Sequence, residues 1–422
     1  MRDASRGTSR SRRVPRLRPC GVALAALFSW AGRARAQEAG VVLDRARVVQ
    51  LAGRGAPAVQ VAEARVGEAR ALRVGADVRS PTNPELSVLA GARFIPNFGP
   101  VPDVSVSLVW PFDFSGARAQ RGAVANARTV VAEAEADDVR RRAVGEALDL
   151  WVRALAAEER SRVEEERVRL DEALVTIARA RRAAGASGDG DLALATAVQA
   201  QGVARLIAAR AEHDALLASL RGRLGLVAES PVRVAADDRE DEPPPLDALL
   251  AGLGRRSDLV RSRAAMQAAR ADVRLQTRLG VPLPRFTING AHDPEYAAHL
   301  GLDLPLPFYQ HNQTATAVAR AQVETATAEG RATLALAQAD LRAAYATWRG
   351  ALDAARALDA AAAATDDAER LATRGYELGE TPLSVQVGVR RETAAARSAR
   401  VEAHAALARA RVALELTAGR FP

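Results

Sequence analysis

The sequence predicts a mainly α-helical protein with a small β part, built from two internal repeats that each hold a long antiparallel helical hairpin and two β-strands. Three observations predict this fold class. Long stretches contain no residue that breaks a helix, short stretches alternate apolar and polar side chains, and the same order of features occurs in both halves. Because four strands cannot close a membrane barrel, we expect four transmembrane strands per protomer and a twelve-stranded barrel of three chains.

The first 36 residues have the composition of a secretory signal peptide. A basic stretch that ends at Arg18 precedes the apolar run "GVALAALFSWAG", and the sequence "ARA" follows at residues 34–36. We predict cleavage after Ala36, so the protein is exported. The cut removes Cys20, the only cysteine, and leaves no disulfide. No later apolar run approaches the roughly 18 residues of a membrane-spanning helix.

The rest of the chain repeats one pattern. Residues 56–88 align without a gap on residues 256–288, at an offset of 256 − 56 = 200. A Pro-Phe pair occurs at Pro111-Phe112 and again at Pro307-Phe308, at an offset of 307 − 111 = 196. Helix, proline, strand pair, Pro-Phe corner, long helix, glycine break and long helix therefore follow in the same order twice.

This duplication divides the exported chain into three parts. We expect a first structural repeat over residues 37–232 and a second over residues 247–422. The intervening residues 233–246, "RVAADDREDEPPPL", are acidic and proline-rich, as expected of a linker. Both repeats are expected to form one domain.

The predicted strands lie beside the Pro-Phe corners. Residues 85–94 and 104–110 alternate in the first half, and residues 286–289 and 299–307 alternate in the second. The clearest case, "HLGLDLPLP", places four leucines on one face. Such alternation predicts a sheet with one apolar face, which fits lipid outside and water inside a barrel.

The predicted hairpins use helices longer than those of ordinary globular domains. Residues 115–184 contain no proline and few glycines, and the returning helices cover about 191–223 and 383–418. The hairpins turn at residues 185–190 and 379–382. A narrow apolar stripe, typical of a coiled-coil contact, follows these helices at Leu148, Trp151, Leu155, Val163, Leu170, Leu174 and Ile177, and at Leu341, Tyr345, Trp348 and Leu352.

Charge and motif patterns argue against other functional classes. The net charge is +8, but part of the basic excess lies in the signal peptide and the rest is mixed with acidic residues along helices. This pattern is typical of solvated helices and gives no reason to expect a nucleic-acid partner. Carboxylates such as Glu164 and Glu166 are expected to be solvated.

Three histidines fall close together in the second half, but we do not expect a metal site. His292 and His299 are expected to flank an external loop, whereas His311 lies beyond the far end of a strand. No catalytic triad, zinc motif or phosphate-binding glycine loop is present in the sequence. We therefore expect no catalytic residue, no cofactor and no enzymatic activity.

These features together resemble the TolC family of outer-membrane efflux proteins. The resemblance is carried by "NPELSV" (83–88), "VSLVWPFDFSGARAQRGAVANA" (106–127), "LGLDLPLPFYQHNQTATAVARAQ" (300–322) and "YELGETPLSVQVGVRR" (376–391). It covers the whole exported chain, and its specificity comes from the duplicated order of the motifs.

The resemblance implies a homotrimer with a barrel in the outer membrane of a Gram-negative bacterium and an α-helical barrel, the tunnel, in the periplasm. The tunnel tips would contact a periplasmic adaptor (membrane fusion) protein that couples to an inner-membrane pump, including pumps of the RND type for metal or drug efflux. The protein would be a passive exit conduit. Its barrel–tunnel junction would contain Trp110, Pro111, Phe112, Pro307 and Phe308.

The resemblance also places gating and adaptor contact at the hairpin tips, which contain Gly185, Asp189, Asp191, Gly379 and Glu380. Family members carry acidic residues after the second tip, where this sequence has Val385 and Gly388. We therefore hypothesise that Asp189 or Asp191 forms a cation-selective constriction. The alternative is that these two carboxylates only cap the returning helix.

Two other classes share some of these features. A periplasmic adaptor also uses a long helical hairpin, but it would have one hairpin rather than two copies with strand pairs. A trimeric structural or adhesive stalk would show similar heptads, but without internal duplication. The duplicated strand pairs favour the outer-membrane channel.

Overall fold

The computed structural model describes residues 41–80, 82–236, 243–293 and 295–421. The predicted signal peptide and part of the predicted linker lie outside the described residues. The elements follow in the order β1 (Val41–Leu43), α2 (Arg45–Gly55), α3 (Pro57–Ala76), β2 (Glu85–Ile95), β3 (Gly99–Pro111), α4 (Ala117–Ala183), α5 (Asp189–Leu224), β4 (Val232–Val234), α6 (Leu246–Gly252), the short 3-10 helix η1 (Leu253–Arg255), α7 (Ser257–Leu279), β5 (Arg285–Asp293), β6 (Glu295–Asp303), α8 (Gln313–Leu378) and α9 (Leu383–Thr417).

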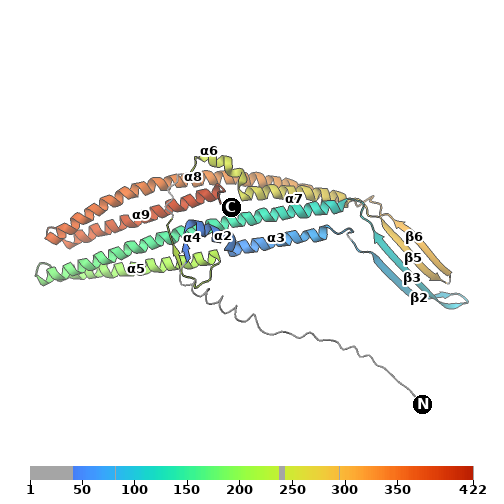
Figure 1. The fold of residues 1–422 in the computed structure, drawn as a ribbon, viewed down its shortest axis with the longest axis horizontal. Helices are drawn as coiled ribbons and strands as arrows, with labels where there is room; N and C mark the ends of the chain where they lie inside the picture. Colours follow the sequence, from blue (N-terminus) through green and yellow to red (C-terminus); the bar gives the residue numbers. More distant parts are fainter. Residues whose placement is uncertain (1–40, 81, 237–242, 294, 422) are drawn as a thin grey trace, which may run out of the picture.

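Two long antiparallel hairpins make up most of the molecule (Figure 1). α4 returns as α5, α8 returns as α9, and both turns lie at the end of the molecule opposite the sheet. α4 contacts α3, α5, α7 and α9, so it joins the two hairpins. The observed ends of α4, α5 and α9 differ from the predicted ones by two residues or fewer. The mainly helical class with a small β part is therefore confirmed.

Buried apolar side chains form clusters along the hairpins. One cluster surrounds Leu148 and Trp151, a second surrounds Leu341 and Trp348, and a third near the tips contains Leu174. These five residues belong to the stripe predicted from the sequence. A leucine or tryptophan side chain contributes about 1.5–3 kcal/mol or more when it is fully buried, so these clusters hold the helices in register.

The four long strands form one antiparallel sheet in the order β2-β3-β5-β6. The pairing of β3 with β5 joins strands from the two halves of the chain, with Leu108 opposite Ile288. Leu86 and Leu300 continue this row on β2 and β6, so all four apolar side chains lie on one face. The predicted alternation is confirmed.

Two strands differ from the prediction, and proline explains one of the differences. β6 ends at Asp303, although the leucine alternation continues to Leu306, because Pro305 has no N–H for the ladder. β3 begins at Gly99 rather than at Val104. Its Pro100 and Pro102 are tolerated because the pairing of β3 with β5 begins only at Val104, so this part of β3 is an edge.

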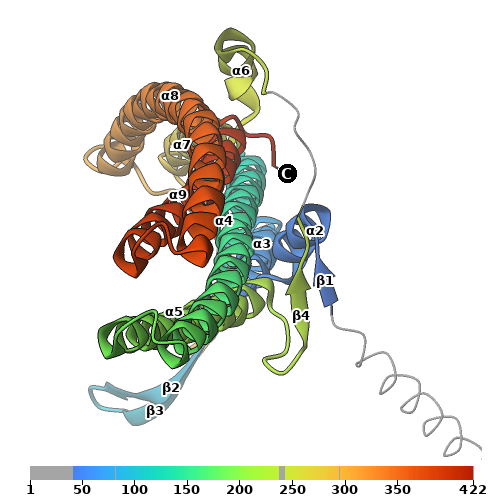
Figure 2. The same cartoon turned by 90° about the vertical axis from the view of Figure 1, so that its left-hand side faces the viewer.

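A second, two-stranded sheet was not predicted. β1 and β4 pair in parallel beside α2 (Figure 2), and β4 includes Arg233 and Val234, the first two residues of the predicted linker. Trp151 of α4 anchors β1, because its Nε1 donates a hydrogen bond of 2.9 Å to the carbonyl oxygen of Leu43. Strands of three residues are too short to show a period, so sequence patterns miss them.

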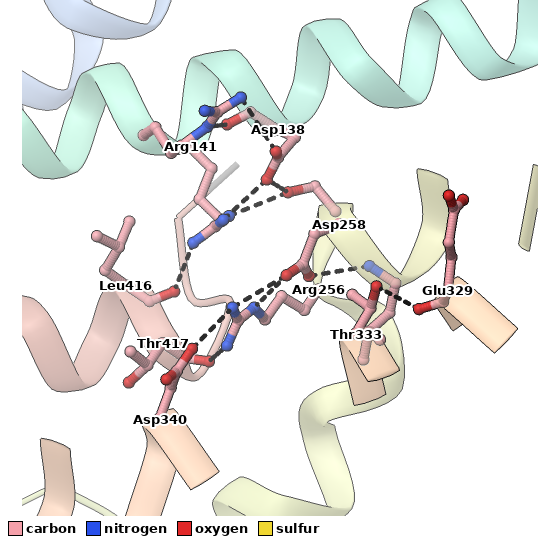
Figure 3. A network of polar contacts seen from close by, with 12 residues as sticks. Asp138, Arg141, Arg256, Asp258, Glu329, Thr333, Asp340, Leu416 and Thr417 are labelled. Carbon is pink, nitrogen blue, oxygen red and sulfur yellow. Dashed lines mark hydrogen bonds and ion pairs between the residues drawn. The ribbon is translucent and has the colours of Figure 1, made fainter. Parts of the chain in front are cut away.

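The end of α9 is held by arginines from other elements (Figure 3). Arg141 donates to the carbonyl oxygen of Leu416 at 3.2 Å and to Asp138 at 2.8 Å. Arg256 donates to the carbonyl oxygen of Thr417 at 3.1 Å. The last carbonyls of a helix lack partners within the helix, and cations are favoured there, so these contacts fix the C-terminal end of α9 against α4 and α7.

Among the described residues, α5 is the one helix long and apolar enough to cross a membrane by length and composition. No such helix is predicted from the sequence. In the structure α5 runs antiparallel along α4 and buries Leu216, Leu220 and Leu224. We therefore assign α5 to the helical hairpin.

Candidate functional site

The two hairpin turns form the first candidate site, and glycine shapes both. α4 ends at Ala183 and the chain turns through Gly185, which has a φ of 71°. α8 ends one residue before Gly379, which has a φ of 80° and whose N–H donates to the carbonyl oxygen of Tyr376 at 3.1 Å. Left-handed backbone of this kind favours glycine, so both predicted glycines occupy positions that need one.

The three predicted acidic residues all lie at these tips. Asp189 and Asp191 occupy the first turn of α5, where the helix dipole favours negative charge, but the N-cap is Gly188 and no side chain caps the helix. Arg182 pairs with Asp189 at 2.5 Å, whereas Asp189 remains 82% exposed. Glu380 is exposed on the second turn. The arrangement thus places carboxylates on both turns.

One contact that sequence reasoning missed joins the two tips. Arg181 of α4 donates to the carbonyl oxygen of Tyr376 at 2.7 Å, and its guanidinium lies 4.8 Å from the centre of the Tyr376 ring. Tyr376 is 2% exposed, and burial raises the pKa of its phenol. The hydrogen bond and the cation–π contact together attach the first hairpin to the second.

A buried charged cluster lies further along the hairpins from the tips, and all four long helices contribute to it. Arg390 of α9 donates to the carbonyl oxygen of Leu170 on α4 at 2.7 Å and lies 3.9 Å from Asp171. Its Nε lies 3.8 Å from Glu369 of α8. On the other side, Arg205 of α5 and Glu164 of α4 are 3.5 Å apart. We call these residues, with Leu170 contributing only its carbonyl, the hairpin cluster.

The hairpin cluster corrects one expectation. Glu164 is 7% exposed and faces Arg205, so it is not solvated as predicted, whereas Glu166 is exposed. Burial raises the pKa of Asp171 and lowers the pKa of Arg390, because burial disfavours the charged form of either group. Because burying these charges costs free energy, the charged contact between the two hairpins adds little to stability.

The second candidate site is the junction between sheet and helices, where aromatic rings pack around the first Pro-Phe corner. β3 ends at Pro111, and the Phe112 N–H donates to the carbonyl oxygen of Pro284 at 3.0 Å. The Phe112 ring stacks on Trp110 at 5.8 Å and meets Phe286 edge-on at 4.9 Å between ring centres. The predicted corner residues Trp110, Pro111 and Phe112 thus link β3 to β5.

The second Pro-Phe corner is built differently. Pro307 and Phe308 lie four and five residues beyond the end of β6, and Phe308 is 77% exposed. α8 starts after Asn312, whose φ of 62° is left-handed and whose side chain donates to the carbonyl oxygen of Gln276 on α7 at 2.8 Å. An asparagine therefore turns the chain here, in the place that Gly116 takes before α4.

The three histidines do not come together. His292 lies on the apolar face of the sheet and stacks on Tyr296 at 4.5 Å, whereas His299 lies on the opposite face and His311 follows β6. Among the described residues, no group of three His, Cys, Asp or Glu side chains could hold a metal ion.

The fold matches solved structures of outer-membrane channels. The outer membrane protein VceC of Vibrio cholerae is 17% identical, with a TM-score of 0.73 over 89% of this chain and 96% of that one. The CmeC channel of Campylobacter jejuni is 14% identical, with a TM-score of 0.74 over 89% and 85% of the two chains. The open MtrE channel of Neisseria gonorrhoeae is 17% identical, with a TM-score of 0.69 over 88% of each. This chain therefore has the outer-membrane channel fold, as the resemblance predicted.

No family model and no curated protein sequence matches the chain.

Proposed function

We propose that the chain is the outer-membrane duct of a tripartite efflux system, a passive conduit for substrates that an inner-membrane pump delivers through a periplasmic adaptor. The observation that carries this proposal is the four-stranded sheet at the end of the hairpins. Its apolar face exposes large side chains, among them Leu86 at 67% and Leu300 at 87%. An exposed apolar face of this size suits lipid.

The edges of the sheet support a trimer. Within the described residues, β2 and β6 each pair with one neighbour only, so each leaves one row of backbone groups without a strand. Open edges are not tolerated in lipid, and three duplicated chains would close them in a twelve-stranded barrel. Fold likeness to VceC, CmeC and MtrE, which are outer-membrane proteins, adds support for a Gram-negative outer membrane.

The hairpin tips are the part of the chain that we propose to contact the periplasmic adaptor. In a trimer the hairpins would form the tunnel, with Gly185, Asp189, Asp191, Gly379 and Glu380 at the end that meets the adaptor. The pump would supply the energy and most of the specificity. We propose that the pump is of the RND type and that the exported substrates are metal ions or drugs.

Cell fractionation and electrical recording test this function. We expect a heat-sensitive trimer in the outer-membrane fraction of a Gram-negative host, and ion conductance when the purified trimer is added to a planar lipid bilayer. A soluble periplasmic monomer without conductance would contradict the proposal.

Ion selectivity tests the tip carboxylates. Because Arg182 already pairs with Asp189, we expect Asp191→Asn to reduce cation selectivity more than Asp189→Asn. The reversal potential in a salt gradient measures the change, and Glu165→Gln, on the exposed α4–α5 contact with Arg210, is the control. Unchanged selectivity in the double variant of Asp189 and Asp191 would contradict a gating role.

A further inference from the structure

The junction between sheet and helices carries three arginines whose side chains have no partner among the described residues. One lies in a strand–helix connection, and the other two lie in the first turn of α4 and the last turn of α7. Arg79 lies 85 − 79 = 6 residues before β2, Arg118 lies 118 − 111 = 7 residues after β3, and Arg278 lies 285 − 278 = 7 residues before β5. All three are exposed, and none forms an ion pair or side-chain hydrogen bond with another described residue. We call these three residues the junction arginines.

Two of the acidic groups nearby are already paired with other arginines. Asp77 pairs with Arg73 at 3.1 Å. Asp113 is nearly buried, pairs with Arg121 at 3.4 Å and accepts a hydrogen bond of 2.6 Å from the Ser115 hydroxyl. With Glu85 and Asp303 included, residues 73–85, 111–121, 278–285 and 303–312 hold six arginines and four carboxylates. The excess charge of 6 − 4 = +2 at this level of the molecule is one that a partner of negative charge would balance.

A groove beside Arg118 has room for such a partner. It is a shallow groove, largely open to solvent, of about 500 Å³, and it is lined by residues of α3 and α4, among them Arg73, Arg118 and Asn126. Arg73 donates to Asn126 at 2.8 Å and crosses α4 closely at Gly122, where an added Cβ would lie 3.4 Å from the guanidinium. The groove thus holds two guanidinium groups against the single carboxylate of Asp77. Guanidinium groups bind phosphate oxygens through paired hydrogen bonds.

Aromatic side chains place this charge at a membrane surface. Large exposed rings gather at the same strand ends, namely Trp110 at 49%, Phe114 at 73%, Phe308 at 77% and Tyr309 at 88% exposure. Aromatic rings mark the boundary between lipid tails and headgroups in membrane barrels. β5 and β6 have nine residues each, which is the length that crosses the hydrocarbon layer. The junction arginines therefore lie next to the headgroups.

We propose that the junction arginines and the Arg73–Arg118 groove bind anionic phospholipid headgroups of the periplasmic leaflet and so select the lipids around the barrel. This inference rests on the proposed outer-membrane function. Each basic residue near a membrane surface favours anionic lipid by a factor of several, so three arginines support a preference of roughly tenfold or more. Salt lowers the preference, because exposed charges are screened.

Quenching of Trp110 fluorescence by brominated lipids tests the proposal. The purified trimer is reconstituted in vesicles that mix phosphatidylglycerol and phosphatidylcholine, with bromine on the tails of one or the other lipid. Trp151 and Trp348 are 5% and 6% exposed in the helical clusters, and a Trp110→Phe variant subtracts their signal. We expect brominated phosphatidylglycerol to quench Trp110 at a roughly tenfold lower mole fraction than brominated phosphatidylcholine.

Two triple variants distinguish an effect of the junction arginines from an effect of removing three positive charges anywhere on the protein. R79Q/R118Q/R278Q should lose the preference, whereas R153Q/R349Q/R356Q, which removes three exposed arginines without described partners from the middle of α4 and α8, should keep it. A gel assay of the heat-sensitive trimer checks assembly, and R118Q alone replaces the first triple variant if that variant does not assemble.

Two other results would contradict the headgroup site or the membrane barrel itself. Equal quenching by both lipids in the unchanged protein, or equal loss of the preference in both triple variants, would overturn the proposed headgroup site. Absence of quenching by either lipid would instead show that Trp110 does not contact a bilayer, and the proposed membrane barrel itself would then fail.

Discussion

Two buried aspartates on α4 are in opposite electrostatic situations. Burial by itself raises the pKa of Asp138, but the hydrogen bond from Arg141 and the charges of Arg141 and Arg142 outweigh it, so the pKa is lowered. Burial raises the pKa of Asp171, and the arginines around it do not compensate. The same residue type on the same helix therefore favours folding when charged at one position and opposes it at the other.

Asparagine substitutions at these two positions should differ in sign. We expect Asp138→Asn to lower stability by about 1–3 kcal/mol at pH 7, because it removes charged hydrogen bonds in a buried site. Asp171→Asn should be neutral or stabilising, because the raised pKa of Asp171 means that its charged form is disfavoured in the folded protein. Thermal unfolding followed by circular dichroism compares them. A larger loss for Asp171→Asn than for Asp138→Asn would contradict this account.

The two pKa shifts have opposite directions, so the stability of the two variants should depend on pH in different ways. The folded pKa of Asp138 lies below that of an aspartate in the unfolded chain, so its stabilising contribution is present above the unfolded pKa and is lost as pH falls through the folded pKa. The folded pKa of Asp171 lies above 3.8, so its unfavourable contribution is present at neutral pH and disappears as pH falls toward 3.8. The difference between Asp171→Asn and the unchanged protein should therefore shrink in acid.

Gly222 and Gly225, at the C-terminal end of α5, give a second prediction for single residues. Gly225 has a φ of 67°, and an added Cβ would lie 2.3 Å from the carbonyl oxygen of Gly55. Gly222 lies in the last turn of α5 with nothing within 4 Å of an added Cβ. We expect Gly225→Ala to lower stability by more than about 2 kcal/mol through strain and collision. Gly222→Ala should raise it by about 0.5–1 kcal/mol.

Unfolding in denaturant measures this pair under identical conditions. Equal effects of the two alanines would show that the Gly225 turn relaxes without loss.

At the scale of elements, the two hairpins meet through few polar contacts near the tips. Arg181 uses the carbonyl oxygen and the ring face of Tyr376, whereas the Tyr376 hydroxyl has no hydrogen-bond partner among the described residues. We expect Arg181→Gln to loosen the second tip against the first, which the apolar cluster around Leu174 still contacts, and Tyr376→Phe to leave the contact intact. The backbone contact and the cation–π contact do not involve the hydroxyl.

Hydrogen exchange and conductance check this prediction. In Arg181→Gln, the amides of Gly379 and Glu380, which bond to carbonyls in the last turn of α8, should exchange several-fold faster, and the conductance of the reconstituted trimer should rise. Tyr376→Phe should behave as the unchanged protein in both assays. Faster exchange in Tyr376→Phe alone would refute the assignment of the contact to Arg181.

Some helix and strand boundaries are set by nearby residues in the sequence, and others are set by the strands that pair with them. The ends of α4, α5 and α9 lie within two residues of the predicted ends, because alanine-rich stretches, glycines and prolines act locally. The pairing of β1 with β4 depends instead on a partner far away in the sequence, whereas β3 begins at Gly99 because it pairs there with Ile95 of the preceding strand β2. No periodic pattern in three residues reveals such a partner.

At the scale of the whole molecule, the two faces of the sheet should differ in their tolerance of charge. Leu300 lies on the apolar face opposite Ile288, and the neighbouring His299 lies on the other face opposite Asn289. In a membrane barrel an arginine on the lipid face near the midplane costs about 2–4 kcal/mol, whereas the lumen is wet. We expect Leu300→Arg to deplete the outer-membrane trimer and His299→Arg to leave it unchanged.

Immunoblots of unheated and heated membrane fractions measure the trimer in both variants. If His299→Arg depleted the trimer as strongly as Leu300→Arg, the assignment of the two faces to lipid and lumen would be wrong.

The sequence by itself determined the helical hairpins, the strand pairs, the apolar face of the sheet and the fold class, because each depends on residue order over one element or on the recurrence of that order in both halves. The tertiary structure alone decided which charges meet. Glu164 is indistinguishable in sequence from the solvated carboxylates around it, yet it faces Arg205 across a buried helix contact, and Arg181 lies against Tyr376, 195 residues away. Such pairs depend on the rotation and register of packed helices, which a helical pattern leaves open.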